Sequence, residues 1–120
     1  MIKRKEGKNK YEEAINYFKD ALEVNKHLYI AKRYIADSYF ELKKYTEAIK
    51  FYKEIHQNEK VILCFDLQKE LSGNVVELAK DKSKFYKEIG LYDKAKEVLT
   101  MEAISIISNS IESSSIEEVN

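Results

Sequence analysis

The stretch YTEAIKFY, at residues 45–52, decides the fold because it recurs along the chain. A near copy, YEEAINYF, lies at residues 11–18, so the two stretches begin 34 residues apart (45 − 11 = 34). A looser third copy, YDKAKEVL, lies at residues 92–99. Each copy has a tyrosine followed three residues later by an alanine, as in Tyr45 and Ala48. A helical pattern that returns every 34 residues predicts an all-α chain made of helix-turn-helix repeats.

Apolar residues around these copies recur at the spacing of an α-helix. In the segment 11–25 they include Ile15, Phe18 and Leu22, which are three and four residues apart and share one helix face. The same spacing predicts further helices at 29–43, 46–58 and 75–89, and one that begins near residue 93. Residues 1 to about 8 are expected to be the end of a separate, earlier helix, because the first repeat lacks about its first six positions. Two explanations stay open: the chain is a fragment of a longer protein, or this first helix is short and frayed. The chain has no proline and three glycines, which favours helices with short connections.

The period is broken before the third copy. Tyr45 and Tyr92 are 47 residues apart (92 − 45 = 47), which is 13 more than one period (47 − 34 = 13). We therefore expect about three repeats with an insertion before the third. The segment 59–73 is rich in apolar residues that need burial, so it is predicted to form an extra helix or helical turn rather than a loose loop.

These observations divide the chain into a repeat domain at 1–108 and a Ser/Glu-rich C-terminal tail at 109–120. For the tail, a weak helix and disorder both remain open. The repeats are expected at about 1–28, 29–62 and 76–105, with the insertion at about 63–75.

These residues resemble the tetratricopeptide repeat family, in which small and aromatic residues occupy fixed positions. In the second repeat the matching residues are Ala36, Tyr39, Tyr45, Ala48 and Tyr52. In the first they are Tyr11, Ala14, Phe18 and Ala21, and in the third Tyr86, Gly90, Tyr92 and Ala95. The resemblance implies an α-solenoid, in which stacked repeats bury the faces that a single repeat cannot bury.

Charge and composition exclude several classes of function. Lys plus Arg and Asp plus Glu are both 21, so the chain is neutral and no nucleic-acid or membrane-surface partner is expected. The longest apolar run, at residues 61–65, is far too short to span a membrane. Cys64 is the only cysteine, and the N-terminus has no secretory pattern. We therefore expect a soluble, cytoplasmic protein.

No catalytic or metal-binding pattern is present in the sequence. His56 and Cys64 are eight residues apart with no second cysteine, which is not a zinc spacing. The three glycines are isolated, so they cannot form a phosphate-binding loop. We expect no enzyme activity, no cofactor and no metal.

The resemblance implies that the first helices of the repeats line a concave groove that binds a peptide or partner protein. The residues placed in this groove are Arg33, Asp37, Phe40, Lys80, Lys84 and Lys87. The three lysines are four and three residues apart, so they share one helix face. They could hold an acidic peptide with one apolar anchor, or they could simply be a solvated face.

A protein-interaction module is therefore the leading hypothesis. Some family members clamp the acidic tails of heat-shock chaperones, but Lys3, Tyr34, Glu77 and Asp81 stand where that clamp needs Asn, Asn, Lys and Arg. Two alternatives are an accessory region of a larger enzyme or regulator and a self-assembling scaffold. Self-assembly would use uncapped ends of the array or the apolar segment 61–71.

Overall fold

The chain folds into helices joined by short connections. The computed structural model describes the backbone of residues 2–119 and the side chains of residues 10–111. The helices are α1 (Ile2–Val24), α2 (Tyr29–Glu41), α3 (Tyr45–Glu54), α4 (Asn58–Leu71), α5 (Val75–Glu88) and α6 (Tyr92–Val119). No strand occurs between residues 2 and 119. The all-α prediction is therefore confirmed.

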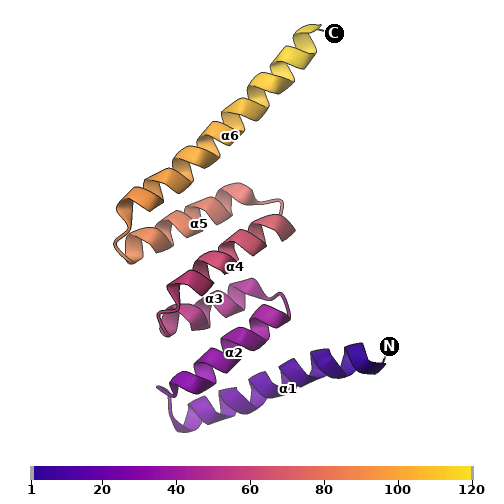
Figure 1. The fold of residues 1–120 in the computed structure, drawn as a ribbon, viewed down its shortest axis with the longest axis vertical. Coiled ribbons are helices and arrows are strands. Elements are labelled where there is room, and N and C mark those ends of the chain that lie inside the picture. The colour runs from indigo at the N-terminus through magenta and orange to yellow at the C-terminus, as the bar shows by residue number, and fades with distance from the viewer. Residues whose placement is uncertain (1, 120) are drawn as a thin grey trace. The chain divides into compact units, whose positions relative to one another are not determined.

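The helices form two compact units, Met1–Leu71 and Ser72–Asn120. In the first unit α1 packs on α2, α2 on α3 and α3 on α4, and successive helices run in opposite directions (Figure 1). In the second unit α5 packs on α6. Each unit is thus built from neighbouring antiparallel helices, as expected for a helical repeat array.

One type of turn connects the helices at three places. It contains a residue with positive φ, and these residues are Lys43 (60°), His56 (59°) and Gly90 (83°). The following residue donates its backbone N–H to a carbonyl five positions back, at 2.8–2.9 Å, and the accepting residues are Tyr39, Tyr52 and Tyr86. This pattern is the Schellman ending of a helix, which satisfies carbonyls that the helix leaves free.

The positions of these turns explain the broken period. The turns at Lys43 and His56 are 13 residues apart (56 − 43 = 13), and the turn at Gly90 lies 34 residues beyond His56 (90 − 56 = 34). The 13 extra residues therefore correspond to one helix with its turn, and the 34-residue spacing resumes from the α3–α4 turn. The extra helix expected within 59–73 is observed as α4, and it begins before the predicted insertion at 63–75.

Small buried residues allow the helices to approach closely. Val61 on α4 stands three residues after the first residue of its helix, as Ala48 does on α3 and Ala95 on α6, and all three are buried. In the second unit, Ser83 Oγ on α5 donates a hydrogen bond to the carbonyl of Ala95 at 3.0 Å. These contacts form the tight seams between adjacent helices.

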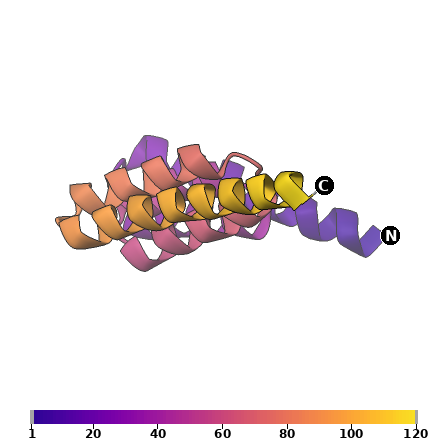
Figure 2. The same cartoon turned by 90° about the horizontal axis from the view of Figure 1, so that it is seen from above.

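One helix boundary differs from the sequence-based expectation, and at the other end the structure adopts one of the two alternatives that the sequence left open. The break expected between residues 8 and 11 is wrong, because α1 is continuous and its N-terminal part extends past the end of α2 in both views (Figure 1, Figure 2). Residues 2–10 contain one apolar residue, Ile2, so a separate helix there would have no face to bury. At the other end, α6 continues to Val119 through most of the expected tail.

Candidate functional site

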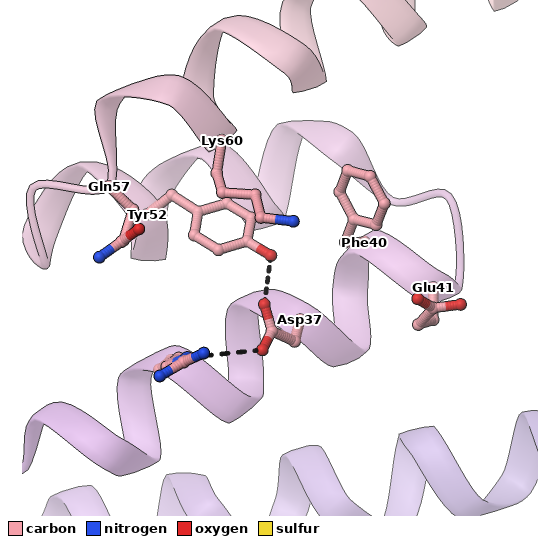
Figure 3. Close-up of a pocket in the computed structure, with 7 residues that line it drawn as sticks. Asp37, Phe40, Glu41, Tyr52, Gln57 and Lys60 are labelled. Atoms are coloured by element: carbon pink, nitrogen blue, oxygen red, sulfur yellow. Dashed lines mark hydrogen bonds and ion pairs between the residues drawn. The ribbon is translucent and has the colours of Figure 1, made fainter.

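A pocket of about 290 Å³ opens in the first unit, between α2, α3, the α3–α4 turn and the start of α4. The residues that line it are Arg33, Asp37, Phe40, Glu41, Tyr52, Gln57 and Lys60 (Figure 3). Arg33, Asp37 and Phe40 were placed in the binding groove from the sequence. The structure brings these three side chains together and adds four that the sequence did not place in the groove.

The spacing of α2 explains how its residues reach the pocket. Arg33, Asp37 and Phe40 are four and three residues apart, so they lie along one face of the helix. Ala31 and Ile35 lie on another face and are buried. The buried face fixes α2 in the unit, and the polar face is left to line the pocket.

A buried tyrosine and a carboxylate lie at the centre of the pocket. The hydroxyl of Tyr52 donates a hydrogen bond to Oδ1 of Asp37, and Nε of Arg33 lies 3.9 Å from Oδ2 of the same carboxylate (Figure 3). Burial, together with the hydrogen bond to Asp37, raises the pKa of Tyr52. The phenol therefore stays protonated and remains a donor, and both oxygens of Asp37 have a partner.

The carboxylate of Asp37 orients Arg33 but engages only part of its guanidinium group. An arginine carries five N–H groups, and the contact with Asp37 engages Nε. Among the described residues no other partner of the guanidinium is found, and its side chain is largely exposed. The two terminal nitrogens are thus free to bind a ligand.

Lys60 supplies a second cation from α4. Its Nζ lies 5.2 Å from the ring centroid of Phe40, an arrangement in which the ring attracts the charge. Phe40 is in turn held edge-on by Tyr45, with ring centroids 5.5 Å apart. Within the described part of the chain, no carboxylate pairs with the ammonium group of Lys60. The pocket thus gains an unpaired charge from the extra helix.

The charges are unevenly distributed in the pocket. Figure 3 shows Gln57 and Glu41 at opposite ends, with Tyr52 and Lys60 between them. Gln57 Nε2 donates a hydrogen bond to Tyr29 Oη at 3.1 Å, which ties the turn to α2. The formal charges of the lining residues cancel, but Asp37 is already engaged on both oxygens. A ligand therefore meets the terminal nitrogens of Arg33 and the ammonium group of Lys60 along the pocket, and the carboxylate of Glu41 at its end.

An apolar surface adjoins the pocket on α2. Tyr29, Ile30 and Tyr34 are each about half exposed. Tyr34 stacks on Phe18 of α1, with ring centroids 5.2 Å apart, which holds its ring in place. This surface can bury apolar side chains next to the charged pocket.

The remaining predicted groove residues lie in the second unit. Lys80, Lys84 and Lys87 are exposed on α5, and Lys80 Nζ lies 3.8 Å from Glu77 Oε1 one turn away. They belong to a different unit from Arg33, so a groove that combines the two sets stays a prediction.

Cys64 does not line the pocket. Among the described residues, no three His, Cys, Asp or Glu side chains form a group that could hold a metal ion. Cys64 is buried, and burial raises its pKa to about 11, so it is a poor nucleophile near neutral pH. In the same part of the chain, no helix is long and apolar enough to cross a membrane.

Stacked antiparallel helices with one recurring turn define a helical repeat protein. Residues 5–28 and 35–55 match the family model of the tetratricopeptide repeat, which supports assigning the chain to that family. Both matched segments lie in the first unit, which also contains the pocket. Searches of curated proteins and of solved structures found no match. Tetratricopeptide repeats are generally non-catalytic protein-interaction modules.

Proposed function

We propose that the chain binds an extended, acidic segment of a partner protein along α2, with the pocket of the first unit as its anchor. The observation that carries this proposal is the pair of cations in the pocket: Arg33, whose terminal nitrogens are left over by its contact with Asp37, and Lys60, which pairs with no carboxylate among the described residues. The family supports the general role, since its repeats bind proteins.

The chemistry of the two cations favours a carboxylate in the ligand. The terminal nitrogens of Arg33 form a planar fork that fits the two oxygens of a carboxylate. Asp37 holds the guanidinium through Nε, so less side-chain freedom is lost when the ligand binds. Lys60 adds a second positive charge without a competing partner among the described residues.

The apolar surface beside the pocket sets the second requirement. A ligand with an apolar residue next to its acidic residue can bury that side chain against Ile30 and Tyr34 while its carboxylate reaches Arg33. Phe40, on the pocket side, offers a further apolar contact. The expected ligand is thus a short segment that combines acidic and apolar residues.

A display library of random peptides tests this proposal with a defined probe. The chain is expected to select peptides that carry at least one acidic and one apolar residue, and their affinity is expected to fall as salt rises. The double variant Arg33→Gln/Lys60→Gln should lose these peptides by tenfold or more, on the order of 1.4 kcal/mol. The matched control is Lys94→Gln/Lys96→Gln, which removes two exposed charges from α6 and should bind as the unchanged chain does.

The same library separates the pocket from the lysines of α5. If Lys80, Lys84 and Lys87 belong to the binding surface, changing all three to Glu abolishes binding while the helical circular-dichroism signal survives. If they are a solvated face, binding persists in that variant. Selection of basic peptides, or equal binding by the Arg33/Lys60 variant and its control, would contradict the proposed site.

A further inference from the structure

Helix α6 is much longer than the helix it packs on. It has 28 residues, whereas α5 has 14. At about 1.5 Å per residue, the two helices are roughly 42 Å and 21 Å long. The second half of α6 therefore extends beyond its partner in the second unit (Figure 1).

An apolar stripe runs along the side of α6 that faces away from α5. Ala95 is buried in the seam with α5. Ile104 follows nine residues later, and at about 100° per residue it lies roughly 180° around the helix from Ala95. The stripe consists of Met101, Ile104, Ile107 and Ile111, which are 61%, 52%, 57% and 60% exposed. Ile106, which is 50% exposed, lies on the opposite side of α6, close to the direction of Ala95. The stripe is the side on which four large apolar residues lie open at spacings of three and four, and such a patch indicates a binding surface.

We propose that this stripe pairs with the same stripe of a second copy of the chain, in a two-fold symmetric helix pair. The low charge of the segment favours an identical partner. Between residues 98 and 111 the only charged residue is Glu102, although 35% of the whole chain is charged. Glu102 already has a partner. Two copies can therefore meet without bringing like charges together.

The same composition disfavours a membrane surface or a charged partner protein as the binding partner of this face. A helix that lies on a membrane surface carries Lys and Arg along the rim of its apolar face, and residues 98–111 contain neither. A partner chosen by charge would find only Glu102 to contact. Small residues flank the stripe instead, and Ala103 and Ser108 let a second helix approach closely.

The apolar area of the stripe limits the affinity of the two copies for each other. Complete burial of an aliphatic side chain removes roughly 60–120 Å² from water, so four half-exposed residues in each of two copies bury roughly 250–500 Å² of side-chain area. Stable interfaces usually bury more than about 1,000 Å². The pair is therefore expected to be weak and to form at high concentration.

Sedimentation equilibrium of the whole chain tests the proposal. As the concentration rises from about 10 µM to about 1 mM, the apparent mass is expected to rise from 14.1 kDa toward twice that value, 28.2 kDa (2 × 14.1). The variant Ile107→Gln/Ile111→Gln should remain at the mass of one chain over the same range. The control Val24→Gln/Leu71→Gln removes two exposed apolar residues outside α6 and should associate as the unchanged chain does.

Three outcomes would overturn the proposal. They are a single-chain mass at every concentration, equal association of the Ile107/Ile111 variant and the unchanged chain, and a mass that rises beyond two copies without levelling off. Helical circular dichroism is measured on every variant. If the double variant has lost helix, the single change Ile111→Gln takes its place, because Ile111 lies well away from Ala95 and its seam with α5. That variant should still reduce the association constant by threefold or more.

Discussion

The hydroxyl of Tyr52 on α3 donates a hydrogen bond to the carboxylate of Asp37 on α2, with the two oxygens 2.5 Å apart. This bond joins two neighbouring helices at the base of the pocket. Because the same carboxylate holds Nε of Arg33, the bond also helps to set the direction of the guanidinium. A contact that stabilises the fold is thus also a contact that shapes the site.

Replacing Tyr52 by Phe removes this hydrogen bond and keeps the buried ring. We expect the free energy of unfolding to fall by about 1 kcal/mol, which is typical of one hydrogen bond. Affinity for the selected acidic peptides should fall as well, because Arg33 loses its fixed carboxylate. Urea denaturation measures the first effect and peptide titration the second. Tyr92→Phe changes an exposed tyrosine and is the control; equal losses in both variants would remove the special role of Tyr52.

Alkaline pH should destabilise the chain through two of its buried acids, the thiol of Cys64 and the phenol of Tyr52. Burial raises the pKa of Cys64 from 9.0 to about 11 in the folded state, and burial with the Asp37 hydrogen bond raises that of Tyr52 above its usual 10. The unfolded chain therefore loses these protons first. Stability is fully present below about pH 9 and falls as the pH rises from there through 11.

The measurement is the urea midpoint between pH 8 and pH 11, about the range in which free thiols and phenols titrate. The unchanged chain should lose stability more steeply with pH than Tyr52→Phe or Cys64→Ala, each of which lacks one of the two acids. A slope that is the same in all three proteins would show that these groups do not control the alkaline transition.

The 34-residue offset was sufficient to predict the helices that contain the copied motif, and the family pattern then placed Arg33, Asp37 and Phe40 on the exposed face of α2. It could not reveal Tyr52 as a pocket residue, because a buried aromatic at that position fits equally well as core. Lys60 was missed for another reason: it lies on α4, whose agreement with the repeat becomes visible only at an offset of 13 residues.

The 13-residue offset is hard to see in the sequence because equivalent positions carry different residue types. Val61 stands where α3 has Ala48, and His56 adopts the positive φ that Gly90 adopts later in the chain. The length of α6 was obscured in a similar way, since its Ser-rich composition is typical of both a weak helix and a disordered tail.

Ala48 should tolerate no increase in size. It is completely buried in the first unit, three residues after the start of α3. Ala48→Leu is expected to lower the free energy of unfolding by about 1–3 kcal/mol, because extra methylenes must be forced into a packed seam. Ala103→Leu provides the control at an exposed position of α6 and should change stability by less than about 0.5 kcal/mol. If the two variants had the same thermal midpoint, the contact around Ala48 would be able to relax around Leu.

The turn at Gly90 can be tested against a second glycine in equally open surroundings. A Cβ added at Gly90 or at Gly73 would meet no atom within 4 Å, so neither change causes a clash. The two positions differ in backbone conformation: Gly90 has φ of +83°, a region that residues with a Cβ rarely adopt, and Gly73 is not in that region. Gly90→Ala should therefore cost about 1 kcal/mol of stability.

Gly73→Ala should be neutral or slightly stabilising, because alanine restricts the unfolded chain and meets no strain in the folded one. The reciprocal change, His56→Gly, removes a side chain from the same left-handed position in the α3–α4 turn. It relieves strain of roughly 1–2 kcal/mol but adds freedom to the unfolded chain worth about 0.4–1 kcal/mol, so a small net gain in stability is expected. Denaturation of the three variants under one set of conditions gives the comparison. If Gly90→Ala and Gly73→Ala were equally stable, the positive φ would not control the turn, and the equivalence of the turns at 43, 56 and 90 would have to come from packing alone.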